Sequence, residues 1–275
     1  MSKKAGHQAR KRFGQNFLHD PGVIERIIRA IHPKPDDAIV EIGPGLGAIT
    51  EEILTVNPRL QVVELDRDLI PVLRTKFFNY PEFRIHEADA LTFDFSQIAD
   101  TKPLRIIGNL PYNISTPLIF HLLSQAGAVQ DMHFMLQKEV VQRMAAVSGD
   151  NNYGRLGIMT QYFCKVQPLF EVAPGAFRPA PKVDSAIVRL VPHKQLPHPA
   201  KDFTTLQTVV RTAFNARRKT LRKALGSLVT VEQLQALGIN DGLRPENLSL
   251  ADYVSIADML VAEKDIEKGS GGNND

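Results

Sequence analysis

The residues Asn109, Leu110, Pro111 and Tyr112 form a group that could bind a planar heterocycle. They follow Gly108, which ends an apolar run that we expect to be a buried strand. The Asn109 side chain has one carbonyl acceptor and two amide donors, Pro111 restricts the turn, and Tyr112 offers a face for stacking. Adenine is the heterocycle that this group predicts. The alternative is a plain strand-to-helix turn in which Asn109 is a cap and Tyr112 belongs to the core.

The same four residues favour one reaction, methyl transfer to the exocyclic N6 of adenine. The lone pair of N6 is delocalised into the ring, so the nitrogen is a poor nucleophile. If the Asn109 side-chain oxygen and the Leu110 carbonyl hold both N6 hydrogens, the lone pair can turn towards a sulfonium methyl group. We therefore expect Asn109, Leu110, Pro111 and Tyr112 to be catalytic, with S-adenosylmethionine as cofactor. A flipped-out base needs a second stacking face, and Phe177 is the candidate, with a role as a core residue as the alternative.

The cofactor site is predicted by a glycine-rich turn. The apolar segment 38–42 precedes Gly43-Pro44-Gly45-Leu46-Gly47-Ala48, and a helix is expected over 49–54. This strand, turn and helix are typical of the first nucleotide-binding unit of a doubly wound sheet. The turn also fits the pattern G-x-G-x-x-A, so a nicotinamide dinucleotide and an oxidoreductase remain the alternative. The group that begins at Asn109 favours S-adenosylmethionine, because hydride transfer has no need of it.

Two carboxylates are further cofactor candidates. Glu64 lies about 20 residues after Gly43, at a strand end, where an acidic residue can bond ribose hydroxyls. Asp89 could accept a hydrogen bond from the adenine amine of the cofactor, or could simply cap a helix. Gly43, Glu64, Asp89 and Asn109 each follow a successive predicted strand, and ligands of open α/β sheets bind at that edge.

Basic residues near the C-terminal end predict an RNA contact. Arg217, Arg218 and Arg222 belong to a segment that we expect to open a helix, where Arg218, Arg222 and Arg211 would share a face. Such a face could bind RNA phosphates, although charge runs are often only solvated. The basic N-terminal residues, including Arg10-Lys11-Arg12, favour RNA.

The segment pattern predicts an α/β fold, a Rossmann-like methyltransferase sheet followed by a small all-helical domain. The expected strands are 38–42, 60–65, 83–86, 104–107, 132–136, 162–166 and 186–191, the last two forming an antiparallel hairpin at the edge. The expected domains are a catalytic domain with a basic N-terminal arm at 1–192, a linker at 193–199, a helical RNA-binding domain at 200–268 and a disordered tail at 269–275.

Composition sets further limits. The chain has 275 residues, a formal net charge of +3 and one cysteine, so an internal disulfide is impossible and basic surfaces must be local. The histidines form no metal-like pair, and we expect no metal. No apolar run approaches membrane-spanning length and no secretory signal is evident, so a cytoplasmic protein is expected.

Five segments together resemble the ribosomal RNA adenine dimethyltransferases, above all the bacterial small-subunit (16S) members. The segments are Phe13-Gly14-Gln15-Asn16-Phe17-Leu18, Glu41-Ile42-Gly43-Pro44-Gly45, Glu64-Leu65-Asp66, Asn109-Leu110-Pro111-Tyr112-Asn113-Ile114-Ser115 and Pro181-Lys182-Val183-Asp184-Ser185. The resemblance implies dimethylation of N6 on two adjacent adenosines near the 3′ end of the small-subunit RNA during ribosome assembly, by a monomer that binds the immature subunit. It also implies that Asn16 and Leu18 contact the cofactor, together with Gly43, Glu64, Asp89 and Asn109.

Three other hypotheses remain. Macrolide-resistance methyltransferases, which act on large-subunit RNA, share part of the pattern, as do mitochondrial transcription-factor relatives that bind nucleic acid with reduced methylation. The segment Lys182-Val183-Asp184-Ser185 disfavours the first, and the intact cofactor segments disfavour the second. The third is an assembly factor for the small subunit, in which methylation is secondary.

Overall fold

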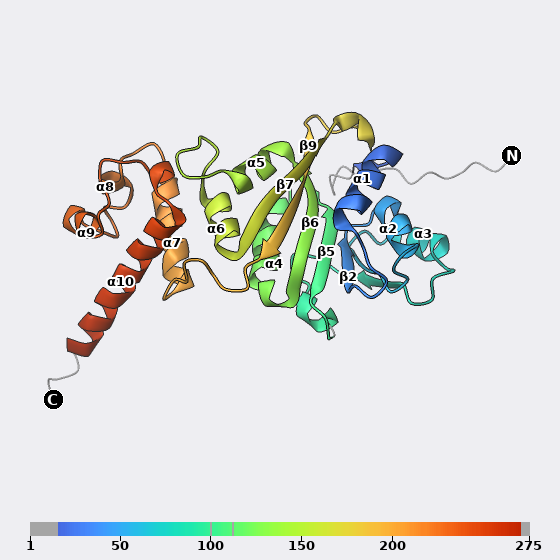
Figure 1. Cartoon of the computed structure of the whole chain (residues 1–275), viewed down its shortest axis with the longest axis horizontal. Helices are drawn as coiled ribbons and strands as arrows, with labels where there is room; N and C mark the ends of the chain where they lie inside the picture. Colours follow the sequence, from blue (N-terminus) through green and yellow to red (C-terminus); the bar gives the residue numbers. More distant parts are fainter. Residues whose placement is uncertain (1–15, 100, 112, 271–275) are drawn as a thin grey trace. The chain divides into compact units, whose positions relative to one another are not determined.

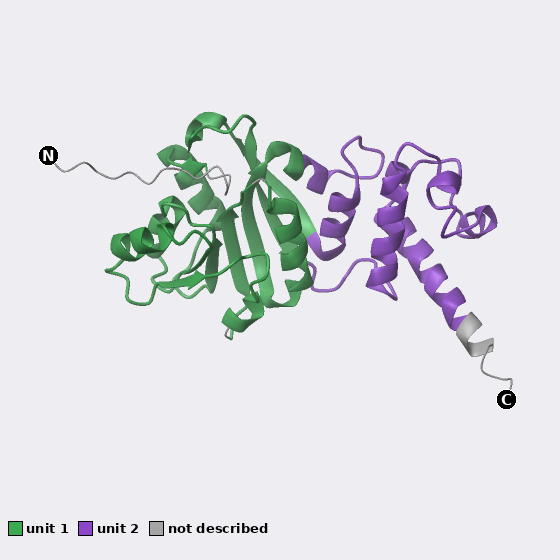
Figure 2. Ribbon diagram, turned by 180° about the vertical axis from the view of Figure 1, so that it is seen from behind, with its two compact units in different colours: residues 1–141, 165–192 green, residues 142–164, 193–275 purple. Residues whose placement is uncertain are grey.

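The computed structural model describes residues 16–99, 101–111 and 113–270 (Figure 1). The chain divides into two compact units (Figure 2). The first comprises the described residues up to Val141 together with Lys165–Pro192, and the second comprises Gln142–Cys164 and the residues from His193 onwards. The last boundary between the two units, between Pro192 and His193, coincides with the start of the predicted linker. Residues 142–164, which the sequence assigns to the catalytic domain, group with the second unit. The functions of the two domains stay predictions.

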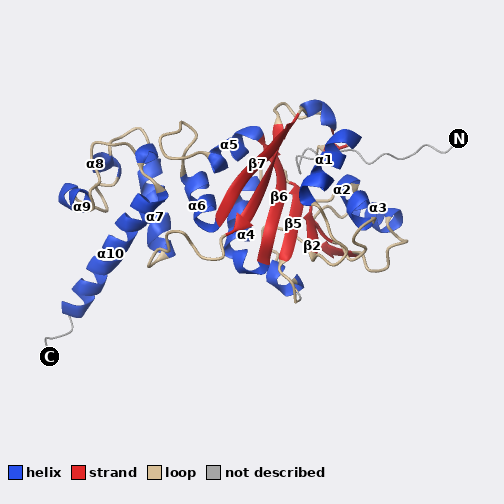
Figure 3. Ribbon diagram, viewed as in Figure 1, coloured by secondary structure: helices blue, strands red, loops and turns tan. Residues whose placement is uncertain are grey.

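A mixed seven-stranded sheet forms the centre of the first unit (Figure 3). Its strand order is β4-β3-β2-β5-β6-β9-β7. The strands are β2 (Ile39–Ile42), β3 (Gln61–Glu64), β4 (Arg84–Glu87), β5 (Leu104–Asn109), β6 (Val129–Gln137), β7 (Cys164–Val172) and β9 (Ser185–Pro192). The strands from β4 to β6 pair in parallel, and β9 pairs antiparallel with β6. This is the doubly wound arrangement that the sequence predicts, with β7 and β9 as neighbours at one edge.

A second, two-stranded sheet fixes the chain near its described N-terminal end. Strand β1 (Phe17–Leu18) pairs antiparallel with β8 (Phe177–Arg178). The sequence predicts a basic N-terminal arm in this part of the chain, but neither the strand at 17–18 nor its partner strand. The pairing joins segments that lie about 160 residues apart in the sequence, so no local pattern reveals it.

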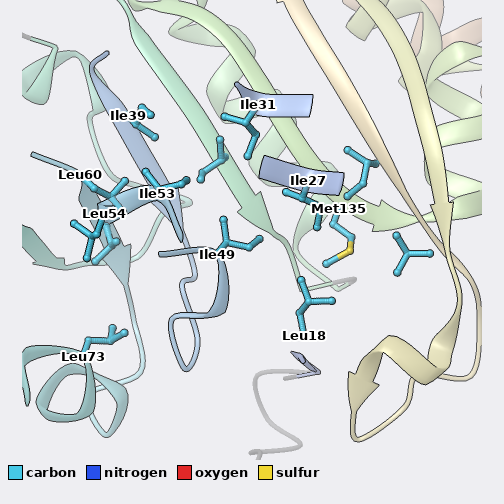
Figure 4. Packing of buried hydrophobic residues seen from close by; sticks show 14 of the residues in the cluster. Leu18, Ile27, Ile31, Ile39, Ile49, Ile53, Leu54, Leu60, Leu73 and Met135 are labelled. Atoms are coloured by element: carbon cyan, nitrogen blue, oxygen red, sulfur yellow. The ribbon is translucent and has the colours of Figure 1, made fainter. Parts of the chain in front are cut away.

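The helices of the first unit are α1 (Pro21–Ile31), α2 (Ala48–Leu54), α3 (Leu69–Lys76), α4 (Ser115–Ser124) and the start of α5 (Lys138–Ala145). Residues of α1, α2 and α3 belong to one hydrophobic core cluster with residues of the sheet (Figure 4). Asp20 caps α1, because its side chain accepts a hydrogen bond from Val23 N at 3.0 Å. Ile27 and Ile31 of α1 are buried in this cluster. The cluster therefore fixes α1 and α2 against the sheet, in which β2 ends at the glycine-rich turn.

The glycine-rich turn has a backbone that other residues could not adopt without strain. Gly43, Gly45 and Gly47 have φ values of 64°, 59° and 78°, in the left-handed region that favours glycine. A Cβ atom on Gly47 would also lie 2.7 Å from the ring of Phe77. The turn therefore depends on glycine for both its conformation and its packing.

The second unit is helical. Its helices are α6 (Arg155–Phe163), α7 (Phe203–Asn215), α8 (Leu221–Ala224), α9 (Val231–Ala236) and α10 (Leu250–Ser270), together with the end of α5. The predicted strand 162–166 is wrong in its first two residues, because α6 continues to Phe163. The physical reason is aromatic packing: the Tyr162 ring stacks on Phe203 with centroids 5.4 Å apart.

Helix α10 extends further than the sequence predicts. Its start is capped, since Ser249 N donates to Asp252 Oδ2 at 2.8 Å. Its backbone continues to Ser270, two residues into the predicted tail, and 271–275 lie outside the described residues. In the described part of the chain, neither this helix nor any other is long and apolar enough to cross a membrane.

Candidate active site

A cavity of about 290 Å³ opens at the carboxyl ends of β2, β3, β4 and β5. This volume is near the lower end, about 300 Å³, of the range for small-molecule sites. Its walls come from residues 16–18, from the glycine-rich turn and from residues at the carboxyl ends of β3, β4 and β5. The lining residues that the sequence singles out are Asn16, Leu18, Gly43, Glu64, Asp89, Asn109, Leu110 and Pro111.

The structure thus brings together in one cavity every cofactor residue that the sequence predicts. It also places three of the four predicted catalytic residues there, and the fourth, Tyr112, lies outside the described residues. Parallel strands explain this convergence, since their carboxyl ends meet at one edge of the sheet. The role of each residue towards a bound ligand stays a prediction.

Asn109 is held from two directions. It is the last residue of β5, where it pairs with Met135 of β6, and Leu110 N donates to Met135 O at 3.1 Å. The Asn109 side chain donates from Nδ2 to the backbone carbonyl of Asn16 at 3.2 Å. The amide is therefore oriented at the cavity wall, beside the glycine-rich turn.

The two predicted carboxylates differ in their surroundings. Glu64 is 7% exposed, and its Oε1 accepts a hydrogen bond from Asp66 N at 2.8 Å. Burial raises the pKa of the Glu64 carboxyl, and the hydrogen bond from the Asp66 backbone partly opposes that shift. Asp89 is only half-buried, and its Oδ1 accepts from Leu91 N at 2.9 Å. Asp89 therefore caps a local turn and lines the cavity at the same time, and it does not start a helix.

Glu41 also lines the cavity, and the sequence alone predicts no function for it. It is 2% exposed, it lines the cavity, and its Oε2 accepts a hydrogen bond from Thr50 Oγ1 at 2.6 Å. Burial raises the pKa of Glu41 to about 7, an effect that the hydrogen bond from Thr50 opposes and the charge of Glu64 reinforces. The signal was available in the sequence, since Glu41 is the one charged residue within the apolar segment 38–42.

Phe177 does not lie at the cavity. It is 2% exposed, belongs to the hydrophobic core cluster and pairs through β8 with Leu18. The packing agrees with the alternative of a core residue. A ring with so little exposed surface could stack on a base only after moving, so its role as a second stacking face stays a prediction without support from this geometry.

The arginine prediction needs a correction. Residues 217–220 do not open a helix: α8 begins at Leu221, and Arg218 precedes it in a turn. The reason is that the first N–H groups of α8 bond to another loop, with Leu221 N donating to Leu243 O and Arg222 N to Asp241 O. The shared helical face of Arg218, Arg222 and Arg211 is therefore wrong.

The three arginines also differ in their partners. Arg217 donates to the backbone carbonyl of Asn151 and lies 3.9 Å from a Glu246 carboxylate oxygen. Arg222 forms an ion pair of 2.7 Å with Asp241. Arg218 is exposed and forms no ion pair with any described residue. Of the three, Arg218 is therefore the best placed to bind a phosphate.

The cavity residues fit S-adenosylmethionine. The glycine-rich turn leaves open space at Gly43, where an added Cβ would meet no atom within 4 Å, so a ligand can approach the backbone. The buried carboxyl groups of Glu41 and Glu64 lie in the cavity wall, where a cationic ligand would favour their ionised forms. Asp89 and the backbone around it can receive hydrogen bonds from an adenine amine, and apolar side chains such as Leu65 can cover a ring.

The fold and the cavity together define a class I S-adenosylmethionine-dependent methyltransferase with a helical C-terminal unit. A dimethyladenosine transferase from Plasmodium falciparum has this fold, with a TM-score of 0.75 and 29% identity over 91% of this chain and 98% of that one. The 23S rRNA methyltransferase ErmE has it too, with a TM-score of 0.68 and 24% identity over 90% of this chain and 100% of that one.

The sequence assigns the family. Residues 6–262 match the family model described as ribosomal RNA adenine dimethylase, and the chain belongs to this family. It is 87% identical over 261 residues to the ribosomal RNA small subunit methyltransferase A of Marinobacter nauticus, covering 95% of each protein. It is 64% identical to the protein of the same name from Hahella chejuensis, over 94% of this chain and 95% of that protein. The chain is thus an rRNA adenine dimethyltransferase, and its cofactor is S-adenosylmethionine.

Proposed function

We propose that this protein transfers methyl groups to N6 of two adjacent adenosines near the 3′ end of 16S rRNA, during assembly of the small ribosomal subunit. The observation that carries the proposal is the placement of Asn109 in one cavity with the glycine-rich turn, Glu64 and Asp89. Relatives that share 87% and 64% of their residues with this chain are named as small-subunit methyltransferases, which supports the choice of RNA. We further propose that the protein is a cytoplasmic monomer that acts on the immature subunit.

S-adenosylmethionine, when bound, supplies an electrophilic methyl group on a sulfonium. In the first transfer, Asn109 Oδ1 and the Leu110 carbonyl accept hydrogen bonds from the two N6 hydrogens of the target adenine; in the second, one of these acceptors holds the single hydrogen that remains. These contacts favour a pyramidal nitrogen over the planar one, so they stabilise the transition state more than the ground state. Pro111 restricts the turn, which keeps both acceptors in place. After transfer the nitrogen is cationic and acidic, so it can lose its proton to solvent without a strong base.

The remaining residues hold the reactants. Glu64 accepts from ribose hydroxyls, Asp89 accepts from the adenine amine of the cofactor, and the turn at Gly43 leaves room for the backbone approach. Tyr112 provides a stacking face for the target base, which must leave its stack to enter. Arg218 binds an RNA phosphate in the second unit.

The experiment supplies labelled S-adenosylmethionine and small subunits that lack the modification. The RNA is hydrolysed and the labelled nucleoside is identified, with N6,N6-dimethyladenosine as the expected product. Asn109→Ala should lower the rate by about 100-fold or more, the scale for loss of one preorganised hydrogen-bonding group. The matched control is Asn79→Ala, which alters an exposed asparagine outside the cavity. Label in another nucleoside, or a near-wild-type rate for Asn109→Ala, would refute the proposal.

A further inference from the structure

The Asn109 side chain is a group whose orientation decides whether it can act. An amide has a donor end and an acceptor end, and the proposed role needs the acceptor, Oδ1, to face the target base. The donor end already forms a hydrogen bond: Asn109 Nδ2 donates to the backbone carbonyl of Asn16 at 3.2 Å. The two residues lie 93 positions apart in the sequence. If the amide turned over, Oδ1 would face that carbonyl, and two acceptors would repel each other. The Asn16 carbonyl therefore selects one of the two amide orientations.

The Asn16 carbonyl is itself held by the arm, which we define as residues 16–19. Within it, β1 pairs antiparallel with β8, with Phe17 opposite Arg178 and Leu18 opposite Phe177. The pairing is extended by His19 N, which donates to Ala176 O at 3.0 Å. These contacts fix the backbone of the arm against the first unit.

Side chains of the arm add two more anchors. Leu18 is 8% exposed and belongs to the hydrophobic core cluster. The Phe17 ring packs against the glycine-rich turn so closely that a Cβ on Gly45 would lie 3.1 Å from its Cδ1 atom. The arm thus connects the turn, β8 and Asn109, and Asn16, Phe17 and Leu18 all line the cavity.

We propose that the arm is a positioning device, in which the backbone carbonyl of Asn16 holds the Asn109 amide with Oδ1 turned towards the target base. The inference rests on the proposed function for its catalytic consequence, but the orientation of the amide can be measured without any reaction. Loosening the arm lets the amide rotate, so the fraction of molecules with a usable acceptor falls and kcat falls with it. Binding of the cofactor is affected less, because Glu64 and Asp89 lie outside the arm and only Asn16 and Leu18 of the predicted cofactor residues belong to it.

The arm offers a matched pair of variants at an exposed residue that does not line the cavity. His19→Pro removes the backbone N–H that bonds to Ala176 O, and His19→Ala keeps it. We expect His19→Pro to lower kcat by about tenfold, the effect of roughly 1.4 kcal/mol. The dissociation constant of S-adenosylhomocysteine, measured by calorimetry, should rise by a smaller factor than kcat falls, because Gly43, Glu64 and Asp89 stay in place and only the contacts of Asn16 and Leu18 are loosened. His19→Ala should behave as the wild type in both assays.

A direct readout of the amide separates this inference from the proposed function. In protein with ¹⁵N-labelled asparagine, the Asn109 side-chain NH₂ signals, assigned by their loss in Asn109→Ala, should be protected from hydrogen exchange in the wild type and in His19→Ala. The protection should fall in His19→Pro. Unprotected Asn109 signals in the wild type would overturn the inference, even if the enzyme dimethylates RNA and even if His19→Pro fails to fold. Protected signals with unchanged kcat in His19→Pro would overturn it as well, whereas absence of methylation by the wild type would overturn the proposed function alone.

Discussion

Replacing Glu41 by glutamine should change how the stability of the protein depends on pH. Burial raises the pKa of Glu41 from 4.5 in the reference state to about 7. A shift of this size corresponds to about 3 kcal/mol. Because the folded state holds the proton more tightly, Glu41 does not lower the free energy of unfolding below pH 4.5. As the pH rises from 4.5 to about 7, the unfolded state loses the proton and the folded state keeps it, so the free energy of unfolding falls by about 3 kcal/mol. Above pH 7 both states are ionised and this contribution stays constant.

The Glu41→Gln variant removes this dependence. Glutamine keeps an oxygen that can accept from Thr50 Oγ1, but it adds an NH₂ group to a buried place. The cost of burying that amide, about 1 to 3 kcal/mol, does not vary with pH. The test therefore lies in the pH dependence and not in the absolute stability of the variant.

The assay is urea unfolding of the protein without cofactor at pH 5 and pH 8, followed by circular dichroism because the chain has no tryptophan. Between these two pH values, the wild type should lose about 2.5 kcal/mol relative to Glu41→Gln. Glu82→Gln, which removes an exposed carboxylate, controls for the loss of one negative charge. A difference between the wild type and Glu41→Gln that stays constant from pH 5 to pH 8 would refute the reasoning.

Two further changes test the site and the RNA contact. Gly108→Ala places a Cβ 2.7 Å from the backbone oxygen of Ile42. We expect a loss of about 1 to 3 kcal/mol in the free energy of unfolding by urea. The rate at saturating cofactor should also fall, because the strand that carries the catalytic turn must shift. Wild-type stability of Gly108→Ala would contradict this. Arg218→Ala should weaken RNA binding and lower the slope of log affinity against log salt by about 1. Arg222→Ala, which breaks the pair with Asp241, should mainly lower the melting temperature. Equal salt slopes in both variants would refute the distinction.

The sequence predicted the elements whose signals are local. The apolar segments that end at Gly43, Glu64 and Asn109 became β2, β3 and β5 within a few residues of the expected bounds. Their order along the chain, with a glycine-rich turn after the first, is enough to predict a parallel sheet and a site at its carboxyl edge. The cavity confirms that these residues meet.

What the sequence could not predict depends on contacts between distant segments. The burial of Phe177 follows from the pairing of β8 with β1, and the orientation of Asn109 follows from its bond to Asn16. The helix at Leu221 begins late because its first N–H groups bond to the loop at 241–243. Charge spacing on an assumed helix could not reveal that Arg222 pairs with Asp241 while Arg218 has no ion-pair partner among the described residues.

We propose that Asn109 holds the amino group of the target base inside the cofactor cavity. The most direct measurement is a crystal structure of the protein with S-adenosylhomocysteine and adenosine. We expect Asn109 Oδ1 within about 3 Å of N6 of the adenosine, with Nδ2 still bonded to the Asn16 carbonyl and the cofactor product beside Gly43. An Asn109 amide that points away from the adenosine, or a nucleoside bound outside this cavity, would contradict the account.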